Sequence, residues 1–154
     1  MDKIKDIKKS FICAFNGLFF VVNNERNFKI HIVCALYVLY FSQYYNLSKL
    51  NYAIILLVIA LVMCLEIINT VIEIIINFLS PAYSLFAKKA KDVAASGVLI
   101  SAFFSVIIGL IYFLDFDIIN LIIRDIFFNW LKLMLFLISI ILSTLFIFSK
   151  NKKM

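Results

Sequence analysis

The sequence is poor in residues that interrupt helices and in residues that keep a chain soluble. Only three glycines and one proline occur in 154 residues, and charged residues make up 16%, against roughly 25% in soluble domains. Hydrophobic residues make up 65%, and the mean hydropathy is +1.07. This composition excludes a water-soluble globule and a disordered chain. It predicts an all-α integral membrane protein with short loops.

Cysteine and histidine are also scarce. Cys13, Cys34 and Cys64 are odd in number and lack Cys-x-x-Cys spacing, so neither a disulfide framework nor a zinc site is indicated. The single histidine, His31, is expected to make an interfacial hydrogen bond rather than to catalyse. The chain also lacks the phosphate-binding loop of P-loop proteins, the Gly-rich dinucleotide loop and the HExxH and GxSxG motifs. These absences exclude P-loop and protein kinases and the common hydrolases.

Runs without charge mark the candidate membrane spans, because an ionised side chain in hydrocarbon is costly unless it is paired or functional. Four runs each supply the roughly 20 residues that a helix needs to cross a bilayer. We expect spans at about 30–48, 52–79, 92–114 and 130–149. Before them, apolar residues recur at helical spacing, which predicts an amphipathic helix in the membrane interface at about 4–22.

Lysine and arginine are unevenly distributed between the segments that flank these spans. Twelve of the fifteen lie in the amino-terminal arm, in the loop with Lys88, Lys89 and Lys91, and in the carboxyl-terminal tail. The positive-inside rule therefore places both termini and this loop in the cytoplasm, which requires an even number of spans. The net charge of +6 reflects this topology and attraction to anionic lipids, not nucleic-acid binding.

One span carries polar residues that packing does not explain. Spacings of three, four and seven place Glu66, Asn69 and Glu73 along one face of a helix, over about 10 Å. This face must meet a bundle interior or a polar interface, because exposure to lipid would be costly. The alternative is a pair of protonated glutamates that only hydrogen-bond to neighbouring helices.

Carboxylates and lysines are expected to meet near the cytoplasmic surface. Glu66 and Glu73 lie toward the end of their span that approaches Glu25 and the segment from Lys88 to Asp92. Carboxylates that hold Mg²⁺ beside lysines that hold phosphate are what phosphoryl transfer requires. The residues alone leave three functions open: a lipid kinase, a proton-coupled carrier or small channel, and a non-enzymatic membrane interaction protein. Lys91-Asp92 also fits a simple helix cap.

Four motifs follow one another in a fixed order: Ala14-x-x-Gly17, Glu25-Arg26-Asn27-Phe28-x-Ile30-His31, Glu66-x-x-Asn69-Thr70-x-x-Glu73 and Ala90-Lys91-Asp92-x-Ala94-Ala95. In this combination the chain resembles the prokaryotic diacylglycerol kinase and undecaprenol kinase family of small integral-membrane lipid kinases. The resemblance covers about residues 11–114. It implies a lipid kinase domain at 1–117, with the interfacial helix and three spans, in the bacterial cytoplasmic membrane. Residues 118–154 would then add a fourth span and a basic tail.

The resemblance also implies roles for single residues. Glu66 is the expected general base for the lipid hydroxyl, and Asn69 would help to place that hydroxyl. Glu25 and Glu73 match the glutamates that hold Mg²⁺ against the phosphates of ATP.

Nucleotide and lipid contacts are implied in the same way. Lys91 and Asp92 match the family's nucleotide-contacting pair. Tyr83 and Ser84 are further expected nucleotide contacts, with Ser84 standing where family members commonly carry His. Ala14 and Gly17, together with Glu66, are expected to contact the lipid.

The family further implies a homotrimer whose active sites are shared between neighbouring subunits, and an interfacial helix that admits lipid sideways from the membrane. The Glu25-Arg26-Asn27 and Ser80-Pro81 neighbourhoods resemble the undecaprenol kinase branch. The expected reaction is therefore ATP-dependent phosphorylation of undecaprenol to undecaprenyl phosphate. The alternative is phosphorylation of diacylglycerol to phosphatidic acid.

Overall fold

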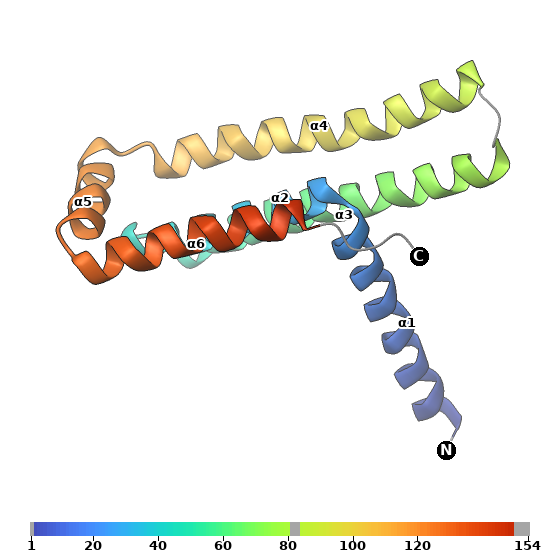
Figure 1. The fold of residues 1–154 in the computed structure, drawn as a ribbon, viewed down its shortest axis with the longest axis horizontal. Helices are drawn as coiled ribbons and strands as arrows, with labels where there is room; N and C mark the ends of the chain where they lie inside the picture. Colours follow the sequence, from blue (N-terminus) through green and yellow to red (C-terminus); the bar gives the residue numbers. More distant parts are fainter. Residues whose placement is uncertain (1, 81–83, 150–154) are drawn as a thin grey trace.

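The computed structural model describes residues 2–80 and 84–149, which form six α-helices and one short 3-10 helix (Figure 1). In chain order these are α1 (Asp2–Asn24), α2 (Arg26–Phe41), η1 (Ser42–Tyr44), α3 (Lys49–Leu79), α4 (Leu85–Phe113), α5 (Phe116–Phe127) and α6 (Trp130–Phe148). No strand occurs in these two ranges. The predicted all-α class is confirmed.

The centre of the fold is the antiparallel pair of α3 and α4, which make the most extensive contact between helices. With 31 and 29 residues they are about 46 and 44 Å long. Both are longer than the roughly 30 Å hydrocarbon core of a bilayer. At the end of α3 and the start of α4 the pair extends well past the beginning of α2 (Figure 1).

The first predicted span, 30–48, corresponds to α2 followed directly by η1. At rises of about 1.5 and 2.0 Å per residue, the two together are about 30 Å long. Ser42, at the junction, is fully buried and donates its hydroxyl to Leu39 O at 2.8 Å. Tyr45 is extended and ends the helical segment. The helical segment, from Arg26 to Tyr44, thus has the predicted length but lies four residues earlier in the chain.

Within the described ranges, three helices are long and apolar enough to cross a membrane: α3, α4 and α6. Most of their side chains face outward from the single chain, and α6 has no buried residue. So large an apolar surface is stable only against lipid or against another apolar surface. The chain is therefore a multi-pass membrane protein.

The structure adds α5, a helix that the sequence analysis does not predict. It lies crosswise at one end of the bundle, between α4 and α6 (Figure 1). The Asp115 side chain caps it by accepting hydrogen bonds from Asp117 N at 3.0 Å and Ile118 N at 3.2 Å. Ile126 on its inner face is buried. With 12 residues, α5 is too short to be a further span.

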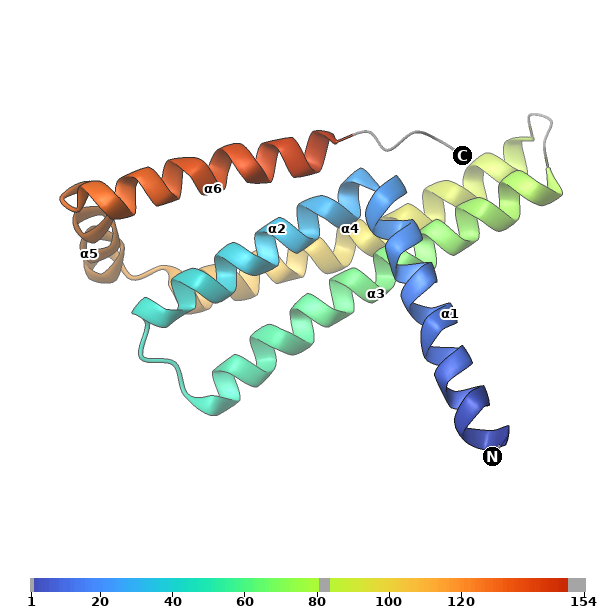
Figure 2. The ribbon, with the colours of Figure 1, turned by 60° about the horizontal axis from the view of Figure 1, so that its bottom comes forward.

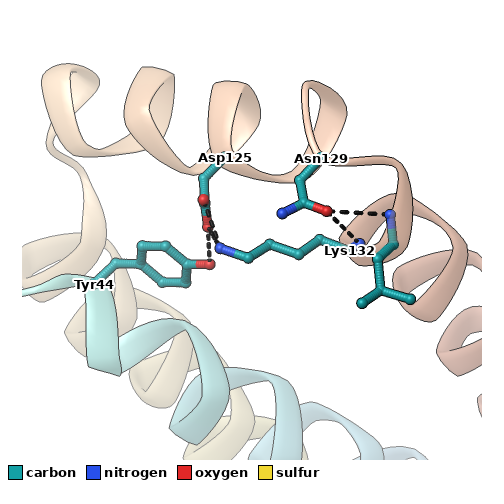
Figure 3. A network of polar contacts seen from close by, with 5 residues as sticks. Tyr44, Asp125, Asn129 and Lys132 are labelled. Carbon is teal, nitrogen blue, oxygen red and sulfur yellow. Dashed lines mark hydrogen bonds and ion pairs between the residues drawn. The ribbon is translucent and has the colours of Figure 1, made fainter.

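A polar network joins α5 and α6 to η1, which follows α2 (Figure 3). Asp125 accepts hydrogen bonds from Lys132 at 2.6 and 2.7 Å and from the Tyr44 hydroxyl at 2.7 Å. Asn129 caps α6 by accepting from the backbone of Leu131 and Lys132. Lys132, and then Tyr44, hold the pKa of Asp125 below its usual value. The network thus explains why the apolar run at 126–149 contains a lysine.

α1 leaves the other helices at a steep angle (Figure 2). Its side chains from Asp6 to Phe20 are exposed, and they include a row of large apolar groups: Ile7, Phe11, Phe15, Leu18 and Phe19. An uncovered amphipathic helix of this kind fits the interfacial position predicted for 4–22. A single residue, Glu25, separates α1 from α2.

Candidate functional site

A polar groove of about 260 Å³ lies where α2, α3 and α4 meet. Its polar side chains come from α2 and α3, and its apolar wall comes from α4. The lining residues are Asn27, Ile30 and His31 of α2, Glu66 and Asn69 of α3, and Ala95, Val98, Leu99 and Ala102 of α4. The groove therefore combines one carboxyl, two amides and one imidazole with an apolar surface.

Glu66 is buried in this groove, with only 1% of its surface exposed. The Asn27 side chain is its hydrogen-bonding neighbour across the groove. Among the described residues the ion pairs are Lys91–Glu73 and Lys132–Asp125, so Glu66 has no cationic partner there. A buried carboxyl beside an amide is suited to exchange a proton with a group that enters the groove. Glu66 thus points into the helix bundle and away from lipid, as predicted.

Thr70 does not share this role, although the sequence places it in the same polar segment. Its hydroxyl donates to Glu66 O at 3.0 Å, one turn earlier in α3. Thr70 therefore satisfies its polarity within its own helix. Asn69, by contrast, lines the groove together with Glu66.

Glu73 lies two turns beyond Glu66 on α3, and the structure pairs it with Lys91 of α4. The distance from Lys91 Nζ to Glu73 Oε1 is 3.9 Å, and the same ammonium donates to Asn77 Oδ1 at 2.6 Å. Half of the Glu73 side chain is exposed. Both side chains of this ion pair are partly exposed, so a ligand can reach them.

Glu25 joins the acidic group from the junction of α1 and α2. It is the N-cap residue of α2, yet its side chain makes no capping hydrogen bond. Partial burial raises the pKa of Glu25, and the charges of Glu73 and then Glu66 raise it further. The carboxyl groups of Glu73 and Glu66 are thus near enough to influence that of Glu25. A divalent cation would relieve this repulsion.

The carboxylates fit a metal ion that is shared with a phosphate. In the ranges that the structure describes, no three His, Cys, Asp or Glu side chains converge closely enough to hold a metal by themselves. Mg²⁺ usually takes one or two protein carboxylates, and phosphate oxygens and water complete its octahedral shell. Glu25 and Glu73 can supply those carboxylates. The donor set therefore suits Mg²⁺ bound to a nucleotide.

The remaining predicted contacts are divided between α4 and α1. Ser84 is the N-cap of α4, and its hydroxyl accepts a hydrogen bond from Ala87 N at 3.4 Å. Asp92 is exposed next to Lys91. Tyr83 lies outside the described residues. Ala14 and Gly17 are exposed on α1, and neither lines the groove of its own chain. The roles predicted for these five residues stay predictions.

Two groove residues on α2 are given no catalytic role by the sequence analysis. Asn27 lies in the motif from Glu25 to His31 but has no predicted role there, and His31 is expected to make only an interfacial hydrogen bond. The structure places both in the groove wall, one turn apart. Their spacing of four residues, which puts them on one face of a helix, is the signal that would have found them.

Comparisons with known proteins cover this part of the chain. The family model described as prokaryotic diacylglycerol kinase matches residues 12–113, from α1 to the end of α4. The chain is 39% identical over 106 residues to the undecaprenol kinase of Bacillus subtilis, which is 69% of this chain and 86% of that protein. It is 35% identical over 101 residues to a diacylglycerol kinase of Synechocystis sp., or 65% of this chain and 58% of the relative. A diacylglycerol kinase of Helicobacter pylori is 30% identical over 105 residues, which is 66% of this chain and 82% of that protein.

Proposed function

The chain belongs to the prokaryotic diacylglycerol kinase family, and from this premise we propose that it transfers the γ-phosphate of ATP to the hydroxyl of undecaprenol. Family membership confirms the predicted class, a membrane lipid kinase. The acceptor lipid, the catalytic base and the metal are the parts that we propose.

The burial of Glu66 in a groove among three helices is the observation that carries the proposal. A lipid hydroxyl that enters this groove meets a carboxylate able to accept its proton. The amides of Asn69 and Asn27 flank that carboxylate and are available to orient the hydroxyl. As the hydroxyl oxygen bonds to the γ-phosphorus, its proton passes to Glu66 and the bond to ADP breaks.

We assign the nucleotide to the exposed end of the α3–α4 pair. Glu25 and Glu73 would hold Mg²⁺, which neutralises phosphate charge in phosphoryl transfer. Lys91, already beside Glu73, supplies a cation for the phosphates. Asp92, Ser84 and Tyr83 are the further contacts that we propose for the nucleotide. In this arrangement Glu25 and Glu73 bind the metal ion at the phosphates, and Glu66 accepts the proton of the lipid hydroxyl.

Undecaprenol is favoured over diacylglycerol by two observations. Identity is higher to the relative named undecaprenol kinase than to the two relatives named diacylglycerol kinase. The Glu25-Arg26-Asn27 segment, which lies beside the groove, also resembles that branch. Diacylglycerol, which would give phosphatidic acid, is the alternative acceptor.

We also propose a homotrimer in the bacterial inner membrane, with sites shared between subunits. Ala14 and Gly17 do not reach the groove of their own chain, so a neighbouring subunit would bring them to it. Both termini are proposed to be cytoplasmic. Lys29 of α2 contacts Ser149, the residue that follows α6, which supports an end of α6 on the side where α2 begins. The kinase domain is proposed to end near residue 117.

A lipid panel tests the reaction and the acceptor together. Purified protein in mixed micelles would receive ATP labelled at the γ-phosphate, Mg²⁺, and either undecaprenol or diacylglycerol. We expect faster labelling of undecaprenol. The opposite preference would establish the alternative acceptor, and no lipid-dependent transfer would refute the kinase. Proton flux in liposomes without ATP would instead support the carrier.

A further inference from the structure

We propose that α6, which lies outside the family match, positions the first turn of α2 for the reaction. The contact is made by Lys29 of α2 with Phe146 and Ser149 at the end of α6, and we call these three residues the α6 anchor. The proposal rests on the lipid kinase activity proposed above and makes Lys29 a positioning residue.

Lys29 is buried, with 3% of its surface exposed. Its ammonium donates to Ser149 O at 2.8 Å and to Ser149 Oγ at 2.9 Å. Nζ also lies 5.6 Å from the centre of the Phe146 ring, within the range of a cation–π contact. A buried ammonium is costly unless it is hydrogen-bonded, and the carbonyl end of a helix attracts cations. The end of α6 therefore provides what keeps Lys29 in place.

Lys29 holds the turn of α2 that carries the groove residue Asn27. Lys29 and Asn27 are two residues apart, which is a rotation of about 200° around the helix axis, so their side chains point to nearly opposite sides. Lys29 thus faces α6 while Asn27 faces Glu66. The backbone N–H of Lys29 donates to Glu25 O at 3.3 Å, which closes the same turn. Contacts on opposite sides fix the rotation of this turn, and with it the positions of Asn27 and Glu25.

The other contacts between α2 and α6 lie away from the groove. The Tyr37 hydroxyl is 3.0 Å from Ser139 Oγ and 3.3 Å from Ser143 Oγ, two turns farther along α2. Figure 2 shows α6 lying along α2 in the opposite direction. No residue of α6 is buried, so α6 contributes little to a packed core. Its influence on the site is therefore expected to pass through the α6 anchor.

The test compares two variants of the full-length chain in lipid nanodiscs. Lys29→Met keeps the length of the side chain but removes the ammonium, and we expect kcat to fall about tenfold through misplacement of Asn27. The KM for MgATP should change less than kcat, by about threefold at most, because Glu73 and Lys91 are on other helices and Glu25 is the one proposed metal ligand on this turn. Lys29→Arg should recover most of kcat. The matched control is Tyr37→Phe, which removes a contact to α6 at a distance from the site and should keep the wild-type kcat.

A second measurement does not require activity. Amide hydrogen exchange at residues 25–30 should be faster in Lys29→Met than in the wild type and unchanged in Tyr37→Phe. Wild-type kcat and wild-type exchange in Lys29→Met would overturn the proposal. A wild-type chain that phosphorylates no lipid would instead refute the proposed function, and the exchange rates would still decide whether the α6 anchor holds this turn.

A variant on the α6 side decides the matter if Lys29→Met does not fold. The double change Phe146→Leu with Ser149→Ala removes the ring and the hydroxyl but leaves the carbonyl of residue 149. We expect a smaller loss of kcat, about threefold, with faster exchange at residues 25–30. Unchanged kcat and exchange in this double variant would overturn the proposal.

Discussion

Lys91 of α4 approaches Glu73 of α3 to 3.9 Å while the same ammonium makes a 2.6 Å hydrogen bond to Asn77. A long, half-exposed ion pair of this kind contributes little to stability. If Glu73 binds the metal ion and Lys91 the phosphate, as we propose, separating the pair therefore costs little. The two residues are already held together on the helix pair, and each has the charge that one half of a metal–phosphate unit requires.

Glu66→Gln should abolish lipid phosphorylation and leave the fold intact. The amide has the size of the carboxyl and can still bond to Asn27, but it cannot accept a proton. We expect kcat to fall by about 10² to 10⁴-fold. Transfer of labelled γ-phosphate, normalised to monodisperse protein, is the measurement. Asp117→Asn on α5 is the control and should keep the wild-type rate. Turnover near the wild-type rate in Glu66→Gln would remove Glu66 as the base.

Glu73→Gln should weaken the binding of Mg²⁺, because it removes a carboxylate ligand. With one of two carboxylates lost, we expect the concentration for half-maximal activity to rise about tenfold or more. Excess Mg²⁺ should then recover part of kcat. The measurement is a Mg²⁺ titration of kinase activity in the wild type and in Glu73→Gln. Glu73→Asp should require an intermediate Mg²⁺ concentration. Identical titration curves would contradict the metal assignment.

Glu25 should make the metal-free protein less stable as the pH rises. Burial, then Glu73 and Glu66, raises the pKa of Glu25 above its ordinary 4.5, so the folded state holds a proton that the unfolded state releases. The free energy of unfolding therefore falls as the pH rises from 4.5 through the raised pKa. Added Mg²⁺ should offset this loss at the upper end of the range, where the carboxylate is ionised.

Thermal unfolding in detergent, with EDTA or Mg²⁺, measures this effect between about pH 4 and 8. Glu25→Gln cannot ionise at this position, so its melting temperature should vary less with pH and gain less from Mg²⁺. Equal pH profiles for the wild type and Glu25→Gln would show that the raised pKa has no consequence for stability.

Local patterns in the sequence were sufficient for the three long apolar helices and for the face that carries the candidate site. Long apolar runs predict α3, α4 and α6, and the seven-residue interval between Glu66 and Glu73 puts both on one side of α3. The family motifs then single out Lys91, which the structure pairs with Glu73. These predictions depend on residues within a few turns of one another, where helix geometry determines position.

Contacts between distant segments could not be predicted in this way. A lysine at position 29 looks like the charged end of a span, and its acceptors lie 120 residues away at Ser149. Lys132 similarly interrupts an apolar run, and only the structure shows that Asp125 and Tyr44 form a polar network with it. The start of α5, by contrast, had a local signal, the capping residue Asp115. Periodicity describes one helix at a time and does not say which helices meet.

Ser84→Asp should separate a nucleotide contact from a helix cap at the start of α4. Aspartate can accept the hydrogen bond from Ala87 N as serine does, and its charge favours a helix N-terminus, so the melting temperature should not fall. If Ser84 also faces the phosphates, as the family resemblance implies, the new charge should raise the KM for MgATP. A repulsion of about 1 kcal/mol corresponds to about a fivefold increase. Ser84→Ala, which removes the cap, should cost about 1 kcal/mol of unfolding free energy. A wild-type KM in Ser84→Asp would show that Ser84 only caps α4, because a negative charge close to the phosphates would weaken nucleotide binding.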